Sequence, residues 1–250
     1  MVFRKSSFRV TLLSFVSLLA IWYLVALLAN SRIFPPPLDV LEVLLESIAK
    51  GELQYHIGHT LMRVFISFVL AMTVGIGIGI ALGISKSLDR FFDSWLTLLL
   101  NVPALVTIIL CYVWLGLVEA AAILAVAINK IPNVIVTIRE GARALERDYL
   151  EMAQTFKLSR TVVLRHIILP QLAPYLVATT RSGLSLIWKI VLVVELLGRS
   201  SGVGFQLHLF FQLFDIASIF AYTLAFVLVI QVLEYGLLQP LERRISRWRR

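Results

Sequence analysis

Long uncharged apolar segments run through this chain and limit its fold more than any other feature. The longest of them, residues 94–118, has 25 residues without a charged side chain. A helix needs about 20 apolar residues to cross a lipid bilayer. Only 15% of the 250 residues are charged, whereas soluble domains usually have about 25%. The sequence therefore predicts an all-α membrane protein.

We expect six transmembrane helices in a single domain that covers residues 1–250. Asn101, Pro103 and Gly116 interrupt the apolar run of the third span. Six spans use roughly 120 residues, which leaves chain for loops but not for a separate folded catalytic domain. The predicted spans are 8–29, 61–84, 94–118, 120–138, 174–197 and 216–238.

The basic residues indicate how these spans are oriented, because cytoplasmic loops retain Lys and Arg. In the six-span arrangement, sixteen Lys and Arg residues fall on one side of the membrane. The other side receives only Arg32, Lys50 and Arg199. This asymmetry predicts that both termini lie in the cytoplasm.

Several other functions have no support in the sequence. The formal net charge is +8, but the basic residues alternate with membrane spans, so we expect no nucleic-acid partner. The chain has no G-x-x-x-x-G-K-[ST] motif for nucleotide binding. We also expect no metal site, because the histidines are scattered; they are His56, His59, His166 and His208.

Three segments between spans are long enough to fold. On the outer side, residues 35–51 have helical periodicity that stops at Gly51. The outer segment 198–215 is too apolar for an ordinary loop, and we expect it to pack at the outer mouth. The inner segment 139–173 predicts two short helices joined by a bend. Ser159 can cap the second of these, and Pro170 should end it.

The inner segment also carries a recognisable motif. Glu151-Met152-Ala153, Lys157 and Ile167-Ile168-Leu169-Pro170 have the spacing E-A-A, three residues, G, nine residues, I-x-L-P. In this motif the chain resembles the membrane permease subunits of bacterial type I ATP-binding-cassette (ABC) importers. Met152 replaces an Ala of the motif and Lys157 replaces its Gly. The stretches ELLGRSSGVGF and LERRISRWRR extend the resemblance to the nitrate/sulfonate/taurine branch.

The resemblance implies a multi-pass protein of the bacterial inner membrane that is not itself an enzyme. It implies two ATPase subunits, a second permease copy and an extracytoplasmic solute-binding protein as partners. It also implies that ATP and magnesium bind to the partner ATPase and that this chain binds no cofactor. The residues that would couple to the ATPase are Glu151, Ala153, Lys157, Ile167, Leu169 and Pro170.

Without the resemblance, the inner segment could be an amphipathic helix that rests on acidic lipid. Lys157 has two interpretations of its own. A Gly at this position would relieve backbone strain at the bend, so Lys is tolerated if the turn is right-handed. Its charge could contact an acidic groove or simply be solvated.

The fifth predicted span carries a polar stripe. At 100° per residue its members fall within an arc of roughly 120°, as expected of a helix that lines a path for an anion. Alternatively, Glu195 pairs with a cation on a neighbouring helix and Arg181 extends to the membrane surface. The stripe consists of Arg181, Ser185, Trp188, Lys189 and Glu195.

Glycines in the second span and a lysine in the fourth also suggest functions for individual residues. Gly75, Gly79 and Gly83 recur every four residues in the second span, which predicts close packing against another helix. Lys130 is isolated in the fourth span and is a weaker candidate for the path.

Two other classes of membrane protein have less support in the sequence. A secondary transporter driven by an ion gradient often has internal repeats, and none is evident here. An intramembrane enzyme would need paired catalytic groups, and the sequence has neither H-E-x-x-H nor G-x-S-x-G. We therefore expect an importer permease for a small anionic solute whose identity the sequence does not specify.

Overall fold

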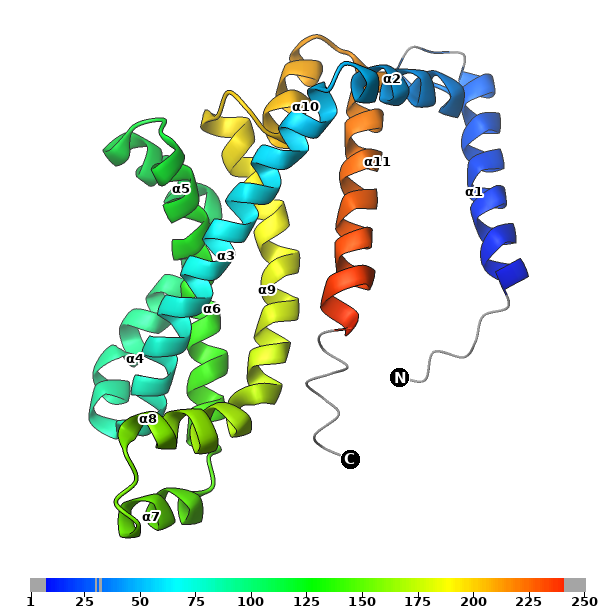
Figure 1. Cartoon of the computed structure of the whole chain (residues 1–250). Coiled ribbons are helices and arrows are strands. Elements are labelled where there is room, and N and C mark those ends of the chain that lie inside the picture. Colours follow the sequence, from blue (N-terminus) through cyan, green and yellow to red (C-terminus); the bar gives the residue numbers. More distant parts are fainter. Residues whose placement is uncertain (1–7, 30, 32, 241–250) are drawn as a thin grey trace.

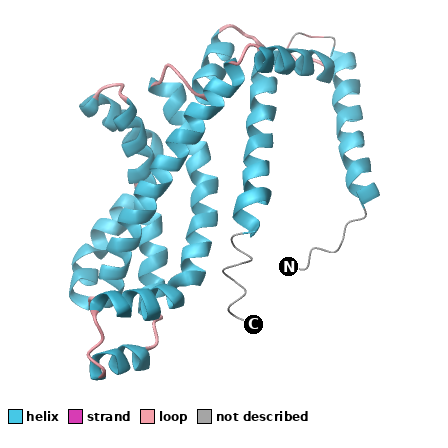
Figure 2. Cartoon of the chain, in the orientation of Figure 1, coloured by secondary structure: helices cyan, strands magenta, loops and turns pink. Residues whose placement is uncertain are grey.

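The computed structural model describes residues 8–29, 31 and 33–240, and this part of the chain consists of helices joined by short loops, without a strand (Figure 2). The helices are α1 (Phe8–Ala29), α2 (Pro37–Ala49), α3 (Glu52–Ile84), α4 (Lys86–Asn101), α5 (Ala104–Leu115), α6 (Glu119–Arg143), α7 (Arg147–Thr155), α8 (Arg160–Val163), α9 (Leu169–Gly198), α10 (Val203–Gln212) and α11 (Ile216–Leu233). Two π-helical turns complete them, η1 (Leu164–Ile168) before α9 and η2 (Glu234–Leu238) after α11. The basic C-terminal stretch 241–250 lies outside the described residues.

Five helical segments are long and apolar enough to cross a membrane. The second and the fourth predicted spans are both shorter than their helices. The second starts at Glu52 and not at 61, because no helix breaker follows Gly51, which has φ 78°. The fourth continues past 138 to Arg143, through Pro132. The five segments are Leu12–Ala29, Glu52–Ile84, Glu119–Arg143, Arg160–Gly198 and Ile216–Gly236.

The third predicted span, 94–118, is not a single straight helix. It consists of α4 and α5, which are bent by 94° relative to each other. The break is at Val102 and Pro103, which are both extended. Proline lacks a backbone N–H, and its ring disfavours a helical conformation of the preceding residue. Together the two helices can form one broken span, which gives six spans.

The fifth predicted span begins earlier than residue 174, and Pro170 does not end a helix. Residues 160–198 form one continuous helical segment. The π-helical turn η1 directly precedes Pro170, and there the N–H of Leu169 bonds to the carbonyl of Leu164. This wider turn makes room for a proline ring. As predicted, Ser159 caps α8, and its Oγ accepts from the N–H of Val162 at 3.4 Å.

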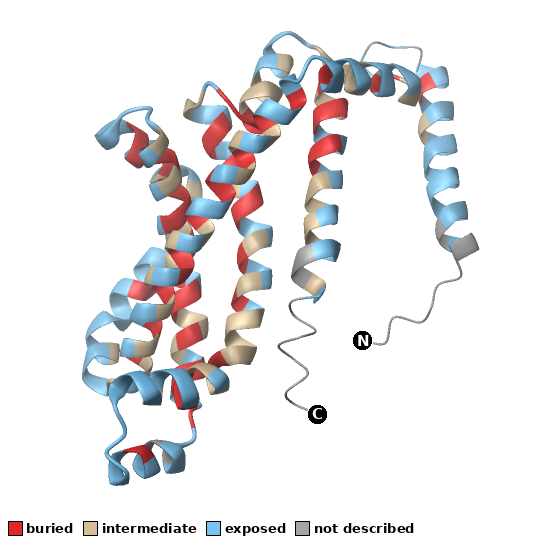
Figure 3. Ribbon diagram, in the orientation of Figure 1, coloured by how far each residue is buried: buried red, intermediate tan, exposed pale blue. Residues whose placement is uncertain are grey.

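The core lies where α3, α6 and α9 cross (Figure 3). Gly75, Gly79 and Gly83 of α3 face α6. A β-carbon on Gly75 would lie 2.6 Å from Cβ of Val134, and one on Gly79 would lie 2.8 Å from Cβ of Ile138. The missing side chains therefore allow the two helix backbones to approach closely.

At one end of the molecule, α2 forms a bridge between α1 and α11 (Figure 1). The Nε1 of Trp22 donates to the carbonyl of Pro35 at 3.1 Å, and the Trp22 ring stacks on Phe220 at 5.6 Å. The rest of α1 stands apart from the core. The beginning of α1 and the end of α11 point toward the end of the molecule that carries α7, as the six-span arrangement requires.

Candidate functional site

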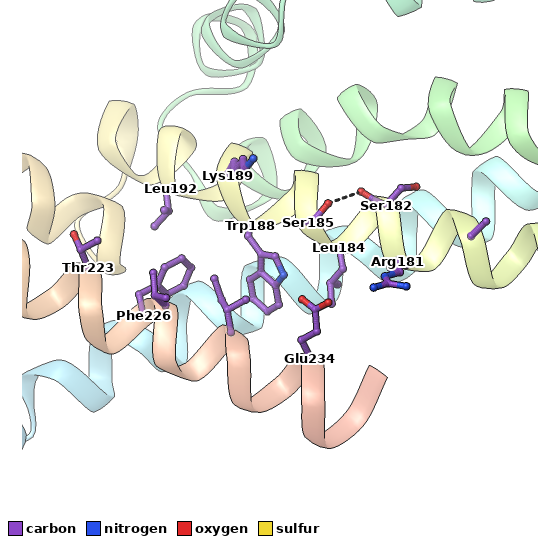
Figure 4. Close-up of a pocket in the computed structure, with 13 residues that line it drawn as sticks. Arg181, Ser182, Leu184, Ser185, Trp188, Lys189, Leu192, Thr223, Phe226 and Glu234 are labelled. Atoms are coloured by element: carbon purple, nitrogen blue, oxygen red, sulfur yellow. Dashed lines mark hydrogen bonds between the residues drawn. The ribbon is translucent and has the colours of Figure 1, made fainter. Parts of the chain in front are cut away.

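A cavity of about 770 Å³ lies between α9 and α11 (Figure 4). Its walls are mainly apolar, and Trp188 and Phe226 meet in them edge to face, with ring centroids 6.2 Å apart. The polar lining residues are Arg181, Ser182, Ser185, Lys189, Thr223 and Glu234. Four members of the predicted stripe thus line one cavity, namely Arg181, Ser185, Trp188 and Lys189.

Glu195, the fifth member of the predicted stripe, does not line this cavity. Its side chain is 0% exposed, and it forms an ion pair with Arg63 of α3, with 2.6 Å between Oε1 and Nη1. The assignment of Glu195 to a polar path is therefore corrected in favour of pairing with a neighbouring helix. The 120° arc placed Glu195 at one edge of the stripe, and that edge faces α3.

Arg63 is the centre of this buried network, and all of its N–H groups have acceptors. It donates to both carboxylate oxygens of Glu119 at 2.6 and 3.1 Å, to Glu195 at 2.6 Å, and to the carbonyl and hydroxyl oxygens of Ser201. Arg199 adds a second ion pair with Glu119 at 2.7 Å. The network therefore joins α3, α6, the end of α9 and the segment after it.

The glycines of the GRSSGVG stretch make room for the Glu195 carboxylate. The N–H of Gly204 donates to Oε2 of Glu195 at 2.8 Å, and Thr60 donates to the same atom at 2.9 Å. A β-carbon on Gly202 or Gly204 would collide with Glu195. This stretch therefore packs closely over the buried carboxylate of Glu195.

The motif segment forms α7, α8 and η1 at the opposite end of the molecule (Figure 1). Lys157 lies two residues after the end of α7 with φ 48°, so the turn is left-handed and the right-handed alternative is wrong. The N–H of Leu158 bonds to the carbonyl of Ala153 at 2.9 Å, and the N–H of Lys157 bonds to that of Gln154 at 3.0 Å. These two bonds define a Schellman motif, whose left-handed position is usually glycine.

The other motif residues divide by exposure. Glu151 and Pro170 are exposed, whereas Ala153 and Ile167 are buried and Leu169 is half-buried. The exposed members are available to a partner, and the buried ones hold the segment in shape.

Side chains from neighbouring helices hold the chain where it enters the motif segment. The side-chain oxygen of Gln171 accepts from the N–H of Glu146 at 3.0 Å, just before α7 begins. At the end of α6, Arg139 pairs with Asp93 of α4 at 2.7 Å, and Arg143 pairs with Asp89. The start of the segment is therefore bonded to α9, and the end of α6 that leads into it is paired with α4.

Lys130 lies outside the cavity, on the face of α6 that packs against α9. It is only 2% exposed, and a β-carbon on Gly183 would lie 3.0 Å from its Cε. Sequence reasoning did not single out Arg63, Glu119, Ser201 or Gln171 as partners. The one available signal was a charged residue near the start of an apolar run, as in the case of Arg63.

Comparison with known proteins identifies the family. The model of the binding-protein-dependent transport system inner membrane component family matches residues 71–247. The permease protein SsuC of Escherichia coli, assigned to aliphatic sulfonate transport, is 32% identical over 192 residues, with 76% of this chain and 73% of SsuC covered. The taurine transport system permease protein TauC of Escherichia coli is 28% identical over 238 residues, with 92% and 86% covered.

A solved structure has the same fold. It is the MetNI methionine ABC transporter in an inward-facing conformation, with a TM-score of 0.67 and 14% identity. The match covers 77% of this chain and 95% of the MetNI chain. Because the family model covers well over half of the sequence, the chain belongs to the binding-protein-dependent transport system inner membrane components, the multi-pass permeases of ABC importers.

Proposed function

We propose that this permease carries a small organic sulfonate through the cavity between α9 and α11. The proposal is carried by the composition of that cavity. Lys189 and Arg181 bring two positive charges to its lining against the one negative charge of Glu234, Ser185 adds a hydroxyl group, and Trp188 and Phe226 add apolar surface. A sulfonate group matches the cations, and a short alkyl chain matches the apolar walls. The names of SsuC and TauC support the same class of solute.

We further propose that ATP is hydrolysed on separate subunits that dock on the segment from Glu151 to Pro170. Glu151 is exposed on α7, which protrudes from the end of the molecule (Figure 1). The ion pairs at the ends of α4 and α6 would transmit a movement of this segment to the spans. In this arrangement two permease copies and two ATPase subunits form the importer. A solute-binding protein delivers the solute from the outer side, and ATP with magnesium binds only to the ATPase.

Uptake by reconstituted vesicles tests this proposal. The permease, its ATPase and its binding protein are placed in proteoliposomes, and the uptake of radiolabelled taurine is measured. We expect uptake that requires internal ATP and the binding protein, and that persists when ionophores dissipate ion gradients. Uptake that needs a gradient and not ATP would favour a secondary transporter and would contradict the proposal.

The same vesicles test the coupling segment. Glu151→Lys reverses a charge on the exposed face of α7 and should abolish ATP-driven uptake, although the protein still inserts. Glu46→Lys, an exposed change on α2, is the matched control for charge reversal. Full uptake by the Glu151→Lys protein would instead favour a segment that rests on lipid.

A further inference from the structure

One face of α3 holds the GRSSGVG stretch, which runs from the end of α9 to the start of α10. The N–H of Gly202 donates to Nδ1 of His56 at 3.0 Å. The N–H of Val203 donates to Oγ1 of Thr60 at 2.9 Å, and one turn further along α3, Arg63 also binds the stretch. The three α3 residues have the spacing of one helix face, so the stretch is bonded along two turns of α3.

His56 differs from the other two α3 residues because its acceptor atom can take up a proton. Threonine does not titrate, and arginine keeps its charge at every ordinary pH. His56 is only 7% exposed. Its ring packs against Phe205 of α10 and Tyr55 of α3, with centroids 6.2 and 5.1 Å away. The imidazole is therefore held in place by its neighbours.

The bond from Gly202 fixes the protonation state of this imidazole. A backbone N–H can only donate, so Nδ1 accepts and carries no proton. Nε2 therefore carries the single proton of a neutral imidazole. It lies 2.7 Å from the side-chain amide of Gln206, which can accept a hydrogen bond through its oxygen. His56 is thus neutral in the bonded state.

A second proton on the ring would break the contact. Protonated Nδ1 would turn an N–H group toward the N–H of Gly202, so that a repulsion replaces the hydrogen bond. A free histidine takes up this proton near about pH 6.5. The bonded state thus holds one proton fewer than the released state, and each pH unit below about 6.5 should favour release up to about tenfold.

The charged groups that act on His56 belong to its own helix. Glu52 favours a second proton on the ring, whereas His59 and Arg63 oppose it. The partners that α10 and the GRSSGVG stretch present to the ring are uncharged, namely Gly202, Phe205 and Gln206. The stretch contains no acidic residue, so a protonated ring gains no counter-charge from the segment that it would have to hold.

We propose that His56 is a pH-sensitive contact that holds the GRSSGVG stretch on α3 near neutral pH and loosens it in acid. The stretch packs over the carboxylate of Glu195 and follows directly on α9. Its loosening therefore frees one end of the helix that lines the cavity. The charge asymmetry of the chain assigns this end to the outer side of the membrane, so the permease would respond to acidity outside the cell.

Hydrogen exchange of the permease, purified with its ATPase in lipid nanodiscs, tests the proposal without any transported solute. The protection of the amides of residues 202–204 is measured between pH 7.5 and 5.0 and corrected for the intrinsic effect of pH on exchange. Their protection should fall by about ten- to thirtyfold in acid. The amides of residues 121–127, in the core of α6, should stay protected, which excludes global unfolding as the cause.

Three variants assign the fall in protection to His56. His56→Asn places a side-chain oxygen where Nδ1 lies but cannot take up a proton, so protection should stay high at both pH values. His56→Leu removes the acceptor, so protection should already be low at pH 7.5. His59→Gln, the matched control three residues further along α3, should keep the wild-type fall in acid.

The Asn variant also separates His56 from a second titratable acceptor of the stretch. The carboxylate of Glu195 accepts from the N–H of Gly204 at 2.8 Å. If its titration loosened the stretch, His56→Asn would still lose protection in acid, and the proposal would be overturned. Wild-type protection that does not change with pH, or loss of the response in His59→Gln, would overturn it as well. The Asn variant decides the question if His56→Leu does not insert.

Discussion

At the scale of single residues, the Arg63–Glu195 pair should be the most sensitive point in the protein. Arg63→Met leaves the Glu195 carboxylate buried with only neutral hydrogen-bond donors. Removing one partner of a buried ion pair costs about 3 to 5 kcal/mol. The double variant Arg63→Met/Glu195→Met should lose less than either single variant, because Glu119 still pairs with Arg199. Melting temperatures of the purified proteins check this order, and simple additivity would show that the two residues are not coupled.

For Lys157 we predict the opposite effect, because its replacement by glycine should increase local stability. Its left-handed backbone costs an L-residue roughly 1 kcal/mol, whereas glycine adopts it without strain. Lys157→Gly should therefore slow hydrogen exchange of the amides at the end of α7 about fivefold. Lys157→Ala removes the same charge but keeps the β-carbon, so it should give no such gain. Equal effects of the two substitutions would mean that the charge, and not the backbone, sets local stability.

At the scale of helices, the α3–α6 contact can be tested with two glycines of the same helix. A β-carbon at Gly79 would lie 2.8 Å from Cβ of Ile138, whereas one at Gly77 would meet nothing within 4 Å. Gly79→Ala should therefore destabilise the protein by about 1 to 3 kcal/mol, and Gly77→Ala should be neutral or slightly stabilising. Thermal unfolding distinguishes them, and two neutral substitutions would mean that α3 and α6 can separate at little cost.

The helices also show how far the sequence alone can specify this fold. Apolar runs predicted the existence of the spans, since bilayer thickness fixes the length of a spanning helix. They could not fix the start of α3, because its first turns are polar and extend beyond the apolar run. Pro103 indicated a break, but the 94° bend depends on how α4 and α5 pack. The partner of Glu195 lies 132 residues away, and no local pattern encodes that contact.

At the scale of the whole molecule, the charge asymmetry makes a topological prediction. In a Cys111→Ala background, Asp148→Cys on α7 should be protected from a membrane-impermeant thiol reagent added to intact cells. Glu42→Cys on α2 should react, because α2 lies at the opposite end of the molecule (Figure 1). Labelling in the reverse pattern would place the motif segment outside the cell, away from any ATPase.

Transport should depend on the charges that line the path of the solute and not on charges outside it. Lys189 lines the cavity between α9 and α11, whereas Lys86 is exposed at the start of α4, outside it. If Lys189 attracts the sulfonate, Lys189→Met should reduce taurine uptake at least tenfold, the effect of losing about 1.4 kcal/mol of attraction, while Lys86→Met should transport normally.

Membrane abundance and ATPase assembly decide what a loss of uptake means. A lysine that merely completed a buried ion pair would leave an unmatched charge when replaced, and the amount of folded protein would fall. Lys189 is exposed to the cavity, so its replacement should leave both abundance and assembly at the wild-type level. Normal uptake by the Lys189→Met protein, or loss of folded protein, would remove this lysine from the solute path.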